Sequence, residues 1–186
     1  MIPPRGLRVS SGMGSVAHCY VQDMSKLAGM DEITSALLRY TRGIDRLDGD
    51  LVLSAFHPGA MCVDYGAEPM KIEDFVTYAI PRLGEAYSAT QHRVSNVAIE
   101  FDEGNCSAIC EAYVLAFHVK QADAAPELHT FNGRYVDRFE RRSDGWKVAT
   151  RTLRVDWSRI ETLDESMGGA WVESGRDRSD VVYQCP

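Results

Sequence analysis

Two polar residues far apart in the chain carry the side chains of a general base. Asp45 lies in the segment Gly43-Ile44-Asp45-Arg46-Leu47-Asp48, and His92 follows Thr90-Gln91. A histidine oriented by a carboxylate can remove a proton near neutral pH without a metal or a cofactor. The pair therefore predicts acid–base chemistry, provided that the fold brings the two side chains together.

An amphipathic helix is predicted to carry Asp45. Apolar residues at alternating spacings of four and three form a single stripe: Ile33, Leu37, Tyr40, Ile44 and Leu47. Asp31 is the predicted N-cap or first-turn acid of this helix, and Gly49 is its predicted stop. Asp45 falls beside the stripe, so we expect it at the boundary between the core and a pocket.

The rest of the chain divides into short helices followed by long strands. A second helix is predicted over residues 51–56, a short strand over 60–65, and a third helix over 71–87 with a kink or break at Pro81. The period then changes to that of strands. Four long strands are predicted over 91–101, 107–121, 129–142 and 146–157. Their glycine-containing turns, 103–105 and 143–145, should supply positive φ angles.

Alternation along the strands predicts which side chains point inward. On the last strand Arg151 shares a face with apolar residues, so we place Arg151 inside and Arg154 outside, although a β-bulge would exchange them. Around His92 both faces carry polar and apolar residues, so alternation leaves its direction open. A buried Arg151 could equally form an ion pair with Asp45, Asp137 or Asp156.

Helices followed by a meander of strands predict an α+β domain, with helices on one face of a curved, mostly antiparallel sheet that encloses a pocket. We divide the chain into an N-terminal arm (1–30), this domain (31–157) and a polar C-terminal tail (158–186) that folds over the domain. No repeat is visible in the sequence.

Composition excludes several functional classes. The 186 residues carry a net charge of −7, which argues against nucleic-acid binding and against attachment to an anionic membrane. No apolar run is long enough for a membrane helix, and no secretion signal is evident. The five scattered cysteines fit reduced thiols in the cytoplasm. The histidines lack the spacing of metal ligands, so no metal and no cofactor are expected.

A larger set of residues resembles a known family. The set joins Tyr40-x4-Asp45 and His92 to Gly133-Arg134-Tyr135-x-Asp137, Gly145-Trp146-Lys147, Arg151 and Asp156-Trp157. This pattern, over about residues 31–157, resembles the SnoaL-like branch of the nuclear-transport-factor-2-like superfamily. It is most similar to the group that contains scytalone dehydratase, bile-acid 7α-dehydratase and hexachlorocyclohexane dehydrochlorinase. The resemblance implies a cone-shaped sheet wrapped round three N-terminal helices.

The resemblance also implies a reaction, cofactor-independent elimination by a lyase. His92 would remove a proton, Asp45 would hold His92, and Tyr40 and Arg151 would handle the leaving group. The reaction would be dehydration or carbon–carbon cleavage with loss of formaldehyde, on a small hydrophobic substrate that is aromatic or alicyclic. The aromatic residues expected to bind it are Tyr65, Phe75, Tyr113, Phe117 and Phe131.

Other activities remain open on the sequence. An isomerase or a polyketide-type aldol cyclase would use the same base, and Tyr40 fits core packing as well as acid catalysis. The same fold also serves as a non-catalytic binding module and as the β subunit of ring-hydroxylating dioxygenases. Its sheet face opposite the helices commonly forms homodimers or homotrimers, and we expect one of these here.

Overall fold

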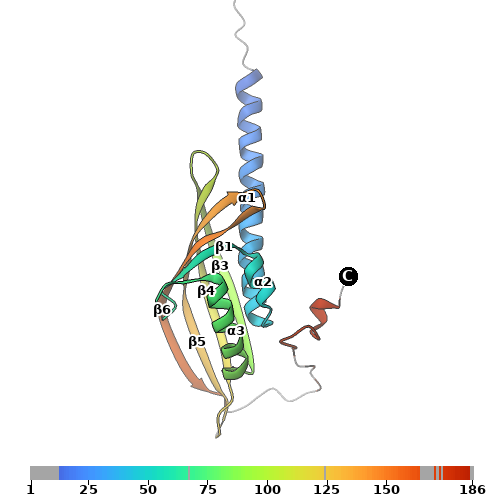
Figure 1. Ribbon diagram of the computed structural model, residues 1–186, viewed down its shortest axis with the longest axis vertical. Coiled ribbons are helices and arrows are strands. Elements are labelled where there is room, and N and C mark those ends of the chain that lie inside the picture. Colours follow the sequence, from blue (N-terminus) through green and yellow to red (C-terminus); the bar gives the residue numbers. More distant parts are fainter. Residues whose placement is uncertain are drawn as a thin grey trace, which may run out of the picture.

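The computed structural model describes residues 13–66, 68–123, 125–163, 170, 172 and 174–184, with side chains from Met24 onward. Three helices pack against one six-stranded sheet, as Figure 1 shows. The predicted α+β class, a cone-shaped, mostly antiparallel sheet with three helices before its long strands, is confirmed. Within the described residues, no helix is both long and apolar enough to cross a membrane.

The helices are α1 (Met13–Asp45), α2 (Gly49–Ser54) and α3 (Ile72–Ala86). The predicted start of the first helix at Asp31 is wrong, because α1 begins at Met13 within the segment interpreted as an arm. The N-terminal part of α1 extends past the sheet (Figure 1), and of its described side chains Met24, Leu27 and Met30 are exposed. A helical segment that does not pack on a core needs no apolar period in the sequence. Residues 1–12 of that arm lie outside the described residues.

The turn after α1 is set by Asp48. Its side chain accepts a hydrogen bond from the Leu51 backbone N–H and so caps α2. Gly49 is therefore the first residue of α2, where the sequence had predicted the end of the preceding helix. The helix α3 continues through Pro81, so the break that was one of the two alternatives predicted there does not occur.

The strands run in the spatial order β2-β1-β6-β5-β4-β3. Neighbours are antiparallel except β1 and β6, which are parallel. Their bounds are β1 (Phe56–Val63), β2 (Met70–Lys71), β3 (Ala89–Phe101), β4 (Ser107–Lys120), β5 (Glu127–Arg142) and β6 (Gly145–Thr162). The four long predicted strands are thus confirmed, and β6 runs five residues beyond its predicted end at Trp157, to Thr162.

Local irregularities decide which residues face the helices. The pairing of β3 with β4 shifts between Ser95 and Ala98, where Asn96 has a φ of 48°. The pairing of β5 with β6 shifts twice, after Asn132 and after Arg138. In the first predicted turn the positive φ belongs to Asn105 rather than Gly104, whereas Gly145 takes the one predicted for it.

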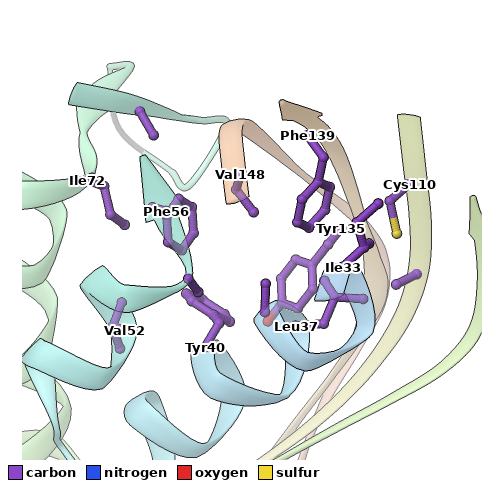
Figure 2. Close-up of a cluster of buried hydrophobic side chains, with 14 of the residues drawn as sticks. Ile33, Leu37, Tyr40, Val52, Phe56, Ile72, Cys110, Tyr135, Phe139 and Val148 are labelled. Carbon is purple, nitrogen blue, oxygen red and sulfur yellow. The ribbon is translucent and has the colours of Figure 1, made fainter. Parts of the chain in front are cut away.

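The core lies between α1 and the inner face of the sheet. Figure 2 shows side chains from all three helices converging with side chains of β1, β4, β5 and β6. Four of the five residues of the stripe predicted for the first helix are buried there: Ile33, Leu37, Tyr40 and Ile44 are each at most 3% exposed. The fifth, Leu47, lies in the turn after α1 and is only partly buried. This packing fixes the rotation of α1 about its axis, and therefore the direction in which Asp45 points.

Candidate active site

Asp45 is the last residue of α1 and is 9% exposed. Its carboxylate accepts three hydrogen bonds from β3: the His92 backbone N–H at 2.9 Å, the Thr90 hydroxyl at 3.0 Å and His92 Nδ1 at 2.7 Å. A carboxylate at a helix C-terminus is disfavoured by the helix dipole, so these donors offset an otherwise unfavourable position. The structure thus brings the two predicted dyad residues together.

The direction of His92, which the sequence left open, is inward. Thr90, His92 and Val94 alternate on the side of β3 that faces the helices. The bulge at Asn96 then changes the parity of the strand, so Ile99 continues the same inner face. This change explains why polar and apolar residues seemed mixed on both faces of the sequence pattern.

The Asp45 contact determines the chemistry of the His92 ring. A carboxylate only accepts hydrogen bonds, so Nδ1 carries the proton that is donated to Asp45. The lone pair of the neutral imidazole is then on Nε2, the nitrogen left for a substrate. This is the arrangement of an oriented general base, in which the carboxylate fixes the tautomer and stabilises the imidazolium.

His92 lines a pocket of about 550 Å³ between α1, α3 and the inner face of the sheet. Three of the five aromatic residues predicted to bind substrate line it: Tyr65, Phe75 and Phe131. Phe117 instead lines a neighbouring groove of about 680 Å³ that also reaches His92 and Asp45. Tyr113 does not line this pocket: it is 39% exposed, because odd-numbered residues of β4 point to the outer face. Tyr113 is therefore not placed to bind substrate in this pocket, contrary to the prediction.

Tyr40 closes the inner end of the pocket. Its hydroxyl lies 3.4 Å from that of Tyr65, and its ring packs edge-on against Tyr135. Burial raises the pKa of Tyr40 above its usual value, and nearby Arg151 only partly opposes that rise. The Tyr40 phenol therefore keeps its proton at neutral pH and can donate a hydrogen bond to a substrate oxygen.

Arg151 points inward, as alternation predicted, and Arg154 points outward to pair with Asp64. Arg151 is fully buried and forms a two-point ion pair with Asp137, at 2.8 Å and 2.5 Å. Its guanidinium lies 4.2 Å from the centres of both the Tyr40 and the Tyr135 rings. Arg151 is not among the residues that line the pocket, so it contacts the site through these tyrosines.

Two histidines in the pocket were not singled out from the sequence. His118 on β4 and His129 on β5 are paired across the strands, and the His118 ring lies 5.2 Å from that of His92. Burial lowers the pKa of His118 to about 4, and the proximity of His92 adds to the effect. His118 is therefore neutral at pH 7. Only the strand register, which the sequence pattern does not state, places His118 near His92 and His129 opposite His118.

Across residues 24–184, apart from the positions that the structure leaves undescribed, no group of three or more His, Cys, Asp or Glu side chains is arranged to hold a metal ion. The three cysteines with described side chains, Cys62, Cys106 and Cys110, are free thiols. What the arrangement offers is an oriented imidazole, a neutral phenol and a neutral second imidazole around an apolar space.

The model of the SnoaL-like domain family matches residues 25–152. No curated protein sequence matches significantly.

Several solved structures share the fold. A putative scytalone dehydratase from Novosphingobium aromaticivorans is 18% identical, covers 81% of this chain and 99% of its own, and has a TM-score of 0.65. A hexachlorocyclohexane dehydrochlorinase from Novosphingobium barchaimii is 16% identical, with coverages of 79% and 99% and a TM-score of 0.66. A putative aromatic ring hydroxylase from N. aromaticivorans is 24% identical, with coverages of 74% and 94% and a TM-score of 0.61.

Proposed function

Because the chain belongs to the SnoaL-like domain family, we propose that it is a cofactor-independent lyase in which His92 is the general base. The observation that carries the proposal is the 2.7 Å hydrogen bond from His92 Nδ1 to Asp45, made at the wall of an apolar pocket. The similarity to dehydratase and dehydrochlorinase structures concerns the fold, and it is consistent with elimination chemistry.

The proposed substrate is a small hydrophobic molecule with an aromatic or alicyclic ring. The pocket volume of about 550 Å³ is in the usual range for small-molecule sites. Its walls include Tyr65, Phe75 and Phe131, whose rings suit a flat ligand, and the surface that lines the pocket is mostly apolar. Tyr40, His92 and His118 also line it, so a ring-bearing substrate with oxygen substituents fits the pocket.

In the proposed dehydration, His92 Nε2 removes a proton from a carbon next to the carbon that bears a hydroxyl group. The C–H electron pair becomes the new double bond, and the C–O bond breaks. The imidazolium, stabilised by Asp45, returns its proton to the departing oxygen, so water leaves. A hydrogen bond from Tyr40 stabilises the negative charge that develops on an oxygen of the substrate.

Arg151 supports this step from behind the pocket wall. Its positive charge lies against the Tyr40 ring and makes the phenol a better hydrogen-bond donor than burial alone would allow. Neutral His118 is a second donor or acceptor near His92. Loss of formaldehyde would use the same groups. His92 would remove the hydroxyl proton of a hydroxymethyl group, and the O–H electron pair would form the carbonyl bond of formaldehyde. The electron pair of the broken carbon–carbon bond would stay on the remaining carbon, which would take the proton back from the imidazolium.

The test is product mass for a panel of hydroxylated aromatic and alicyclic compounds. A lyase product loses water or a one-carbon unit, whereas an isomerase product keeps the mass of its substrate. His92→Ala should lose about 10²–10⁴-fold in kcat while substrate still binds, because general-base catalysis is worth about that much. Full activity of the His92→Ala variant would exclude the proposed base.

A further inference from the structure

Residues 174–184, here called the C-terminal strap, lie against the C-terminal end of α1 (Figure 1) and against Asp48, the N-cap residue of α2. Three contacts anchor the strap: the Tyr183 hydroxyl donates to Asp48 at 2.9 Å, Arg178 pairs with Asp48 at 3.1 Å, and Arg46 pairs with Asp180 at 3.2 Å. The tail predicted to fold over the domain therefore does so in this part.

Arg176 of the strap inserts between elements that also build the site. Its guanidinium donates to the backbone carbonyls of Asp45 at 3.5 Å, Leu83 at 3.3 Å and Tyr87, and to the Thr90 hydroxyl at 3.2 Å. The three carbonyls lie at the C-terminal ends of α1 and α3, where the helix dipoles favour a cation. One side chain thus joins both helix ends to the start of β3.

The contact with Thr90 leads directly to the base. The Thr90 hydroxyl has one proton, which it donates to Asp45 Oδ1, the same oxygen that accepts from His92 Nδ1. Because Arg176 occupies an acceptor position on Thr90, it orients that single proton toward Asp45. Hydrogen bonds in such a chain strengthen one another.

We propose that Arg176 is a positioning residue for the Asp45–His92 pair, and that it acts through the Thr90 hydroxyl. The proposal rests on the proposed function, in that the pair is taken as the general base. Burial lowers the pKa of Arg176, and the charge of Asp45 opposes this lowering, so the cation and the carboxylate interact as well as share Thr90.

A purely structural role would give a different pattern of effects. If Arg176 only held the strap in place, then Arg178, which also anchors the strap but contacts Asp48 rather than Thr90, would matter equally. Arg178→Met is therefore the matched control for Arg176→Met. Thr90→Val removes the hydroxyl through which Arg176 is proposed to act, and Thr90→Ser keeps it.

The first measurement needs no substrate. In the free protein, the downfield NMR resonance of the His92 Nδ1 proton, assigned by its absence in His92→Gln, reports the hydrogen bond to Asp45. We expect this resonance to broaden or move upfield in Arg176→Met and Thr90→Val, and to stay in place in Arg178→Met and Thr90→Ser. An unchanged resonance in folded Arg176→Met, or an equal change in Arg178→Met, would overturn the proposal even if no lyase activity is ever found.

The second measurement uses turnover. Loss of one orienting hydrogen bond should lower kcat about tenfold in Arg176→Met with KM nearly unchanged. The double variant Arg176→Met/Thr90→Val should be no slower than Thr90→Val alone, because both changes remove the same chain of contacts. Effects that multiply would show that Arg176 does not act through Thr90. Thermal unfolding of each variant confirms that it is folded.

Discussion

The carboxylate of Asp45 carries most of the functional argument at the scale of single residues. It converts an ordinary strand histidine into an imidazole with a defined tautomer, and it receives its own support from Thr90 and from the backbone of β3. A second carboxylate, that of Asp137, has a different role, because it neutralises the buried Arg151 beneath the pocket wall. One acidic residue thus tunes the proposed base, and the other stabilises the core.

Asp45→Asn tests the role of Asp45 with almost no change of shape. An amide can offer an N–H where the carboxylate offered a lone pair, so the His92 ring loses the partner that fixes its tautomer and stabilises its positive form. We expect kcat to fall by about 10²–10⁴-fold with little change in substrate binding. The measurement is steady-state kinetics with binding by calorimetry. Near wild-type kcat would mean that orientation by Asp45 is not needed.

At the scale of elements, irregular pairing of β3 and of β6 places the site, and the irregularity in β6 depends on a glycine in β5. Gly133 on β5 lies where the β5–β6 pairing shifts, and a Cβ built there would come within 2.0 Å of the Arg154 carbonyl oxygen. The glycine therefore permits the close backbone approach that brings β6 alongside Tyr135 and Asp137. The Gly133-Arg134-Tyr135 pattern therefore begins with a glycine because a side chain at that position would collide with the backbone of β6.

Gly133→Ala should consequently destabilise the fold by about 1–3 kcal/mol, because backbone rather than a flexible side chain must move. Gly104→Ala is the matched control: its added methyl group would meet its nearest neighbours at 3.9 Å, so its effect should stay within about 0.5 kcal/mol. Urea unfolding of both variants gives the comparison. Equal stability of the two variants would contradict the role assigned to Gly133.

The elements themselves were largely readable from the sequence, since the apolar stripe of α1 and the alternation of the long strands follow from packing on one face. Alternation also placed Arg151 correctly. Alternation could not predict to which face of β3 the His92 side chain points, because the bulge at Asn96 has no distinct sequence pattern. The pairing of His118 with His129 depends on register, and the approach of Arg176 depends on a tail without periodicity. Such long-range contacts are invisible to local patterns.

The whole molecule has two faces of different character. The inner face holds the core and the pocket, whereas the outer face of the sheet exposes Ile109, Tyr113 and Trp157. The homodimer or homotrimer expected from the family resemblance would cover apolar side chains of this kind. That assembly stays a prediction, which sedimentation analysis of the purified protein can check.

The stability of the whole fold should depend on pH through His118, whose pKa lies at about 4 in the folded protein and about 6.5 in the unfolded chain. Between about pH 6.5 and about pH 4, His118 binds a proton in the unfolded chain but not in the folded protein. The contribution of His118 to the free energy of unfolding is therefore complete above about pH 6.5 and is lost as the pH falls toward 4. Measured by urea unfolding, the free energy of unfolding should fall by about 3 kcal/mol more in the wild type than in His118→Gln between about pH 7 and about pH 4. Parallel losses in the two proteins would mean that burial does not hold His118 neutral beside His92, and the proposed neutral partner of the base would have to be abandoned.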